Sequence, residues 1–452
     1  MEPCEHLFRR EAGRIVATLA RIFGVQNLAL AEDVVQDAFC RALEVWKQRG
    51  MPDNPSAWLM ATAKNRALDR LRRERTARAF APELARSLQS EAALAAGVDE
   101  LFEPGAIQDD LLRMMFSCCD RQVSTDAQVA LVLHILCGFS VGEIAAAFVS
   151  TPAAIEKRLA RAKKVLAAST TLFDIGAPTA FAVRLPTVHR ALYLLFNEGY
   201  HGASSEAAVR ADLCREAMRL VCVLLEHPSG KTPASYALAA LLYLGASRLP
   251  ARIDSSGNLC SLFDQDRTRW DEQLVAEGLR LLDLSATGPE LTEYHLEAAI
   301  AGVHAAAPRA EDTDWDAIIS LYDTLMTIRP SPVVALNRAI AIAQRHGAQR
   351  GIDEIQAIAG AERLAAYPFY PAALGELELR LGHRARAAGH FAAALALARN
   401  PMERRFLTER LAVCADGHSV ARRAFSDSSD AVSAEPRSRK SSRSSERQGR
   451  RR

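Results

Sequence analysis

The sequence has few of the features that mark membrane, secreted or metal-binding proteins. It contains no uninterrupted apolar run of about 18 residues, so a membrane span is not expected. Its first residues show no basic segment followed by an apolar stretch, so a signal peptide is not expected either. The nine cysteines are scattered without metal-ligand spacing. We therefore expect reduced, mostly buried thiols in a cytoplasmic protein, with no metal and no cofactor.

Aromatic residues are scarce at 6%, and runs of β-branched residues are rare, whereas alanine and leucine are abundant. This balance favours helix over strand and predicts an all-α fold. The net charge of +2 does not by itself indicate a nucleic-acid partner, so the local distribution of charge matters more. A chain of 452 residues exceeds one hydrophobic core, and several domains are expected.

Helical periodicity runs over residues 7–78, with breaks at 24–27 and 50–55. The stretch 31–39 has apolar residues at helical spacing, which predict a core stripe continuing to Val35, Ala38, Phe39, Ala42, Leu43 and Trp46. Polar and mostly acidic residues occupy its remaining surface: Glu32, Asp33, Gln36 and Asp37. Alone, this pattern is equally typical of an acidic first turn stabilised by the helix dipole.

A basic helix is predicted next, over residues 58–73. Its apolar side consists of Met60, Ala63, Ala67 and Leu71, and its opposite side of Asn65, Arg66, Asp69, Arg72 and Arg73. Basic residues placed in this way can neutralise phosphates while an asparagine among them contacts a base edge. A solvated basic face is the alternative, although the run at 70–75 is denser in arginine than solubility requires.

A helix-turn-helix is predicted after residue 124. An apolar helix at 124–137 ends at Gly138, Ser140 and Glu143 can form a capping box, and Pro152 can open the following helix. The outward side of that helix carries Thr151, Ala153, Glu156, Lys157, Ala160, Arg161 and Lys164. This pattern is typical of a DNA recognition helix, and an ordinary pair of packed helices is the alternative.

Taken in order, the three segments resemble the extracytoplasmic-function (ECF) sigma factors of bacterial RNA polymerase, over residues 7–78 and 108–170. The resemblance implies that Glu32, Asp33, Gln36 and Asp37 bind core polymerase at the clamp coiled coil of its β′ subunit, with the β flap as a further contact. It implies minus-ten promoter contacts by Asp53, Asn54, Trp58, Lys64, Asn65, Arg66, Arg72 and Arg73. It implies minus-thirty-five contacts by Thr151, Ala153, Glu156, Lys157, Arg161 and Lys164.

The remainder resembles the ECF subgroup that has a long C-terminal extension with tetratricopeptide-like repeats. The sequences LFNEGY at 195–200 and LNRA at 336–339 contribute to this resemblance. We expect a linker at 79–107, a helical extension at 171–290, tetratricopeptide-like repeats at 291–416 and a disordered basic tail at 417–452. The resemblance implies regulation by the extension and, as a further partner, a small protein related to the YCII family. Promoter recognition is expected not to require the extension.

Three other functions fit parts of the sequence. A helix-turn-helix regulator with a helical sensor domain accounts for residues 124–168 but not for the two earlier segments. A tetratricopeptide adaptor accounts only for the C-terminal part. An enzyme with a site in the run from Asn197 through Glu198 to His201, with Asp264, Asp266 and His295 as partners, is not favoured, because no catalytic motif accompanies these residues. The sequence therefore predicts a non-enzymatic sigma factor, and run-off transcription with core polymerase separates it from these alternatives.

Overall fold

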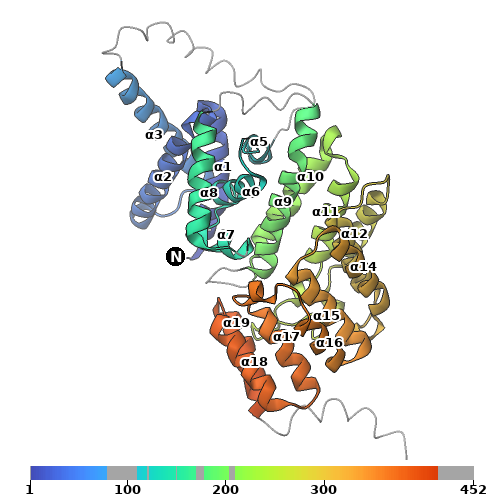
Figure 1. Cartoon of the computed structure of the whole chain (residues 1–452). Coiled ribbons are helices and arrows are strands. Elements are labelled where there is room, and N and C mark those ends of the chain that lie inside the picture. Colours follow the sequence, from blue (N-terminus) through green and yellow to red (C-terminus); the bar gives the residue numbers. More distant parts are fainter. Residues whose placement is uncertain are drawn as a thin grey trace, which may run out of the picture.

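The computed structural model of the chain consists mainly of helices in the residues that it describes, which are 2–78, 109–119, 122–148, 150–168, 178–202 and 209–415 (Figure 1). One isolated antiparallel bridge joins Ile253 to Leu259 in this part of the chain. The predicted all-α fold is therefore confirmed. None of the described helices has both the length and the apolarity needed to cross a membrane. The predicted linker at 79–107 and the predicted tail at 417–452 lie outside the described residues.

The N-terminal part is a three-helix unit of α1 (Glu2–Phe23), α2 (Leu28–Arg49) and α3 (Pro55–Arg78), with a short 3-10 helix at Val25–Asn27. The breaks between these helices fall where the sequence predicts them. Gly24 and Gly50 have φ angles of +85° and +80°, which residues with a side chain rarely adopt.

The buried stripe of α2 differs from the predicted one at Leu43. The buried residues are Leu28, Ala31, Val34, Val35, Ala38, Ala42 and Trp46. Leu43, in contrast, is 54% exposed, so its predicted place in the core is wrong. Position 43 lies about 100° around the helix from Ala42 and therefore at the edge of the stripe, where no other element covers it.

The second unit contains α5 (Asp110–Ser117), α6 (Thr125–Ile135), α7 (Val141–Ala147) and α8 (Pro152–Ala168). The predicted capping box at the start of α7 is present, because Ser140 Oγ accepts from the Glu143 amide and the Glu143 carboxylate accepts from the Ser140 amide. A short turn then leads to α8, so α7 and α8 have the predicted helix-turn-helix arrangement.

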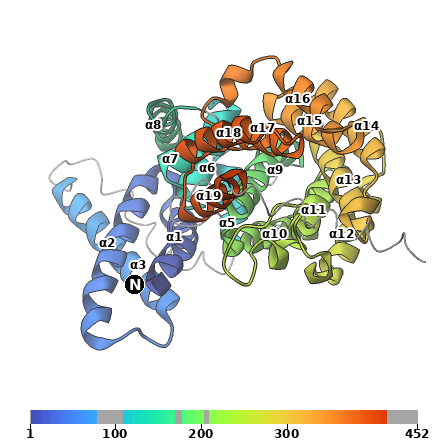
Figure 2. The same cartoon turned by 90° about the horizontal axis from the view of Figure 1, so that it is seen from below.

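The extension continues as packed helices along a curved path (Figures 1 and 2). Its first helices are α9 (Pro178–His201), α10 (Ala211–Glu226), α11 (Pro233–Ala246), α12 (Glu272–Ser285) and α13 (Glu293–Ala306). The later ones are α14 (Trp315–Ile328), α15 (Pro332–His346), α16 (Ala348–Gln356), α17 (Phe369–Arg380), α18 (Arg384–Leu397) and α19 (Pro401–Ala415). Short 3-10 helices lie at Pro228–Gly230, Leu249–Ala251, Arg267–Arg269, Ala310–Asp312 and Ala361–Leu364.

The curved path brings the end of the extension back towards α9. The ring centroids of His201, at the end of α9, and Phe369, at the start of α17, are 6.4 Å apart. Arg405 of α19 also hydrogen-bonds Asn258 at 3.3 Å. The last helices of the extension therefore contact its first helices, and we call the side of the extension between these contacts its inner face.

One hydrophobic core extends from α1 through α5–α8 into the first helices of the extension. Phe116 of α5 stacks on Phe181 of α9 with ring centroids 4.4 Å apart. The first two helices of the extension thus complete the core of the helix-turn-helix unit. This shared core argues against the expectation that promoter recognition is independent of the extension.

Candidate functional site

The acidic face of α2 is turned partly towards the basic helix α3. Asp37 Oδ2 accepts hydrogen bonds from Arg66 Nη1 at 3.1 Å and Arg70 Nη2 at 3.2 Å. Asp33 Oδ2 accepts one from Arg70 Nη1 at 3.1 Å. These pairs are well exposed, and such pairs contribute little to stability, so another partner can replace them. Gln36 is exposed on the same helix.

Glu32 lies apart from this network and contacts the other unit. Its carboxylate accepts from Lys163 Nζ of α8, at 2.9 Å and 3.0 Å to its two oxygens. Lys163 was not among the predicted site residues, because it flanks the buried stripe of α8 and its partner is 131 residues away. The predicted polymerase-binding helix and the predicted minus-thirty-five helix therefore touch.

The predicted minus-ten residues of α3 differ in exposure and in their ion pairs. Lys64, Asn65, Arg72 and Arg73 are exposed, with Arg72 3.8 Å from Asp69, whereas Arg66 is half-buried and paired with Asp37. Sequence reasoning missed Arg70, which bonds both aspartates. The spacing contained a signal for it, because Arg66 and Arg70 are four residues apart, as are Asp33 and Asp37. Two adjacent helices with this spacing can form two arginine–aspartate ion pairs.

The loop before α3 supplies structural contacts as well as candidate DNA contacts. Asn54 Oδ1 accepts from the Ala57 amide at 3.0 Å and thereby caps the first turn of α3. Trp58 packs edge-on against Trp46, with ring centroids 5.5 Å apart, and is only partly exposed. Asp53 is exposed. In this arrangement Asn54 and Trp58 stabilise the helix junction, and Asp53 and Asn54 are both presented to solvent.

The predicted minus-thirty-five residues share one property, which is exposure to solvent: Thr151, Ala153, Glu156, Lys157, Arg161 and Lys164. Their helix is held from the other side by the buried residues Ile155, Leu159, Ala162 and Leu166. Thr151 Oγ1 also accepts from the Ala154 amide at 3.3 Å, at the start of the helix. The recognition face predicted from sequence is therefore exposed as one surface of α8.

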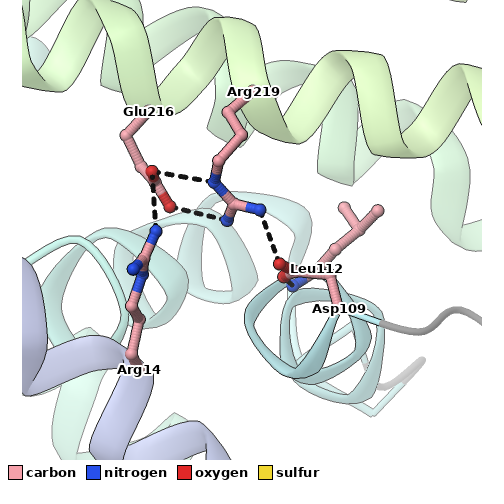
Figure 3. Close-up of polar contacts among 5 residues, drawn as sticks. All are labelled: Arg14, Asp109, Leu112, Glu216 and Arg219. Carbon is pink, nitrogen blue, oxygen red and sulfur yellow. Dashed lines mark hydrogen bonds and ion pairs between the residues drawn. The ribbon is translucent and has the colours of Figure 1, made fainter.

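The extension contacts both sigma-like units through one network of charges, which Figure 3 shows. Arg219 of α10 donates to Asp109 Oδ2 at 2.6 Å and to both oxygens of Glu216, at 3.0 Å and 2.7 Å. Glu216 also accepts from Arg14 Nη2 of α1 at 3.3 Å. The hydrogen bonds with Glu216 and Asp109 raise the pKa of Arg219, so its guanidinium group stays protonated. Asp109 in turn caps α5 through the Leu112 amide at 2.9 Å.

A second, buried connection joins the helix-turn-helix to the sequence LFNEGY. Arg210 is 4% exposed, and its Nη2 donates to Glu198 Oε1 of α9 at 2.6 Å. Its Nη1 lies 3.0 Å from Glu143 Oε1 of α7, as an ion pair. The guanidinium also lies 5.8 Å from the centre of the Phe139 ring. Glu198, one of the residues considered for catalysis, therefore serves to fix Arg210 against the helix-turn-helix.

The other residues of the enzyme alternative also have local structural partners. Asp266 accepts from the Thr268 amide at 3.0 Å, Asp264 accepts from Ser261 Oγ at 2.7 Å, and His295 forms a capping box with Thr292. Asn197 is hydrogen-bonded to Tyr193. No contact among the described residues brings these groups together into one site. The described part of the chain also has no cluster of side chains suited to holding a metal ion.

The comparisons with known proteins agree with this geometry. The sigma-70 region 2 family matches residues 7–77, and a family of unknown function (DUF6596) matches residues 184–286. The uncharacterized protein R00370 of Rhizobium meliloti (strain 1021) is 38% identical over 399 residues, which are 88% of this chain and 92% of that protein. RNA polymerase sigma factor CarQ of Myxococcus xanthus is 34% identical over 160 residues, which are 35% of this chain and 83% of that protein.

No solved structure matches the chain. The match to region 2 covers the α2 and α3 surfaces described above. From α9 onwards the chain is the helical extension, of which residues 184–286 match a family of their own. The chain is therefore a member of the RNA polymerase sigma factors, of the ECF-like type, with a C-terminal helical extension.

Proposed function

We propose that this sigma factor binds core RNA polymerase through the exposed face of α2, reads the minus-ten element with α3 and the minus-thirty-five element with α8, and is held closed by its extension. Gln36, Cys40 and Leu43 follow one exposed face of α2 at helical spacing, next to Asp33 and Asp37. An exposed leucine beside carboxylates suits a partner with both apolar and basic groups. The predicted YCII-related partner stays a prediction from the resemblance.

The observation that carries the proposal is the direct contact between the two DNA-reading units. Lys163 of α8 bonds Glu32 of α2, and α2 packs on α3. With helix diameters of about 10–12 Å, the two reading helices lie within roughly 25 Å of each other. At about 3.4 Å per base pair, positions minus ten and minus thirty-five are roughly 85 Å apart on a straight duplex. The closed arrangement therefore cannot read both elements, and the two units must separate.

Besides the Lys163–Glu32 pair, three further contacts hold α1–α3 against the rest of the chain. Asp110 of α5 accepts from Thr18 Oγ1 at 3.0 Å and pairs with Arg21 at 2.9 Å. A Cβ atom added to Gly13 of α1 would lie 1.9 Å from the carbonyl oxygen of Leu136, so the two backbones meet there. The extension adds the Glu216–Arg14 pair from α10. The extension meets α1 through the partly exposed Glu216–Arg14 pair but packs on α5–α8 through buried rings such as Phe116 and Phe181, so we infer that α5–α8 and the extension move as one body away from α1–α3. This motion has to open the part of the core that α1 shares with α5.

The substitution Gly13→Ala tests the closed arrangement. Alanine favours the helix but cannot fit against Leu136, so it destabilises only the contact between the units. A loss of about 1.4 kcal/mol from the closed state raises the open fraction tenfold where the open state is the minor one. We expect a larger radius of gyration in solution scattering and a several-fold increase in run-off transcription with core polymerase.

Gly389→Ala on α18 is the matched control, because a Cβ there meets nothing within 4 Å. It should leave both measurements unchanged. An unchanged radius of gyration for Gly13→Ala together with reduced transcription would show that the closed arrangement does not limit initiation. Absence of run-off transcription with the unaltered protein on selected promoters would favour the regulator or adaptor alternatives.

Minus-ten reading is expected to depend on Asn65 and Arg73 in different ways. Both are exposed on α3, and Asn65 makes directed hydrogen bonds, whereas Arg73 supplies charge to the backbone. Asn65→Ala should cost about 1–3 kcal/mol on the cognate promoter and less on minus-ten variants. Arg73→Ala should weaken all promoters alike and lower the salt dependence by about one charge.

Permanganate footprinting of open complexes across a small promoter panel, at two salt concentrations, distinguishes these effects. Equal loss on every promoter with Asn65→Ala would mean that Asn65 does not read the sequence. Specificity would then have to come from the loop before α3, where Asp53 is exposed.

A further inference from the structure

The inner face of the extension contains arginines that have no acidic partner. The guanidinium groups of Arg248 and Arg267 lie 5.3 Å and 5.0 Å from the centre of the Trp270 ring, and that of Arg252 lies 4.5 Å from the centre of the Tyr200 ring. Within the described chain, none of the three arginines forms an ion pair, and the Nε atom of each is buried without a hydrogen-bond partner. Most other arginines of the extension that are packed this closely are paired with carboxylates, as Arg210 and Arg219 are.

Arg248 is the least satisfied of the three. Arg267 donates to the carbonyl oxygens of His304 and Ala307 at 2.7 Å and 2.6 Å, and Arg252 donates to the carbonyl oxygen of Tyr200 at 3.1 Å. The Arg248 guanidinium makes no hydrogen bond or ion pair with any described residue and stacks only on Trp270. A half-buried cation without a counter-charge is costly, so such a group is retained where an anion completes it.

The surroundings of Arg248 add positive charge and remain accessible. Burial and the nearby charges of Arg252, Arg248 and Arg399 lower the pKa of His201 well below its ordinary value, so that its ring is neutral at pH 7. Its surface is nevertheless exposed to solvent. Solvent therefore reaches the His201 ring beside these arginines. Arg252 hydrogen-bonds His201 Nδ1 at 3.2 Å, and Arg399 is paired with Glu403 at 2.9 Å, so Arg248 and Arg252 are the cations there that lack a carboxylate partner.

Neutral polar groups line the adjacent part of this inner face. Tyr193, Asn197 and His201 are spaced four residues apart and form one stripe of α9. Tyr193 is hydrogen-bonded to Asn197 and to Glu297, and burial raises the pKa of Glu297 to about 7. Burial raises the pKa of the Tyr322 phenol of α14, which also lies close to Glu297, whose charge raises this pKa, and to Arg248, whose charge lowers it. Sites that orient a small polar molecule commonly combine a cation with phenol and amide groups, as this one does.

The same helix, α9, also holds the helix-turn-helix unit. Arg190 pairs with Asp126 of α6 at 3.8 Å and lies 5.7 Å from the centre of the Phe148 ring. Glu198 reaches α7 through Arg210. A molecule bound to the stripe at Tyr193, Asn197 and His201 therefore contacts the helix to which the DNA-reading unit is attached.

We propose that Arg248 and Arg252, with His201, Trp270 and Tyr322 around them, bind a small anionic metabolite through its carboxylate or phosphate group. Guanidinium groups hold both kinds of oxyanion through paired N–H···O bonds. The aromatic rings fix the planes of the two guanidinium groups in advance, which limits the entropy lost on binding. The proposal concerns binding alone and does not depend on how the two sigma units separate.

Calorimetric titration of the full-length protein with inorganic phosphate, pyrophosphate and citrate, at constant ionic strength, tests the site. Tighter binding of pyrophosphate or of citrate tells a phosphate-bearing ligand from a carboxylate-bearing one. Arg248→Met should weaken the preferred anion at least tenfold. Arg380→Met is the matched control, because Arg380 also stacks on a ring, that of Phe263 at 5.6 Å, but is hydrogen-bonded to Gln344. It should bind as the unaltered protein does.

Thermal unfolding of the variants without ligand distinguishes a structural role of Arg248 from a role in binding. Because Arg248 lacks a partner, Arg248→Met should unfold at the same temperature as the unaltered protein, or at a higher one. A marked fall would show that Arg248 has a structural role and would overturn the proposal. Arg248→Lys keeps the charge without the planar fork and should bind with intermediate affinity. The proposal also fails if none of the three anions binds the unaltered protein, or if Arg248→Met binds them equally well.

Discussion

Replacing Arg210 by methionine is expected to lower the free energy of unfolding by about 3–5 kcal/mol, the usual cost of leaving a buried charge without its partner. The side chain of Arg210 is 3% exposed and lies between Glu143 and Glu198, which are themselves largely buried. Methionine fills a similar volume but leaves two carboxylates without a counter-charge. Because Glu143 also caps α7, the loss should be felt first in the helix-turn-helix.

Thermal unfolding and hydrogen exchange of residues 140–166 measure this effect. A triple variant that adds Glu143→Gln and Glu198→Gln to Arg210→Met should regain much of the stability, because the uncompensated charges are gone. Arg280→Met, which removes an exposed pair with Glu277 on α12, is the control and should change little. Equal stability of Arg210→Met and the unaltered protein would mean that the two glutamates find other partners.

The sequence predicted the features of this region that depend on local signals. The breaks near Gly24, Gly50 and Gly138, the capping box of Ser140 and Glu143, and the proline at the start of α8 all involve residues within a few positions of one another. Backbone sterics and capping hydrogen bonds act over that range, so a single sequence contains their signature. The exposed faces of α3 and α8 also follow from helical periodicity.

The contacts that the sequence did not predict mostly join residues that are far apart in the sequence. Lys163 and Glu32 are 131 residues apart, and Arg14 and Glu216 are 202 apart, so no spacing rule links them. The structural roles of Asn54 and Trp58, which cap and pack the start of α3, were not predicted either, and their promoter contacts stay a prediction from the resemblance. Leu43 fits the period of the buried stripe but lies at its edge. Periodicity alone does not predict how wide a stripe of α2 the neighbouring helices cover.

The role of Glu198 illustrates the same limit within a noted motif. The sequence LFNEGY at 195–200 contributes to the family resemblance as one motif, but its residues have different roles in the structure. Glu198 fixes Arg210, and Gly199 allows α9 and α10 to approach, since a Cβ there would lie 2.7 Å from Cys214 Sγ. Asn197 is hydrogen-bonded to Tyr193 instead. Adjacent residues of a helix face different neighbours, so a motif does not identify a single site.

Truncation after residue 177 is expected to abolish the fold of α5–α8, which the sequence alone treated as complete without the extension. Phe181, Leu185, Val188 and Leu192 of α9 are buried in the shared core. Burial of each contributes about 1.5–3 kcal/mol, and together they are comparable with the 5–15 kcal/mol that stabilises a whole domain. Their loss would expose Phe116, and Asp109 would lose Arg219.

The truncated protein should therefore unfold without a cooperative transition in the helix-turn-helix and should fail to support initiation that depends on the minus-thirty-five element. A chain that ends at Ala415 keeps every described helix and is the control, with unchanged thermal unfolding and an unchanged start site. If the chain of 177 residues instead unfolds cooperatively and initiates at the same nucleotide as the full-length protein, α5–α8 do not need α9. In that event the contacts of Figure 3 would regulate a unit that is already folded, and the extension would be a separate domain.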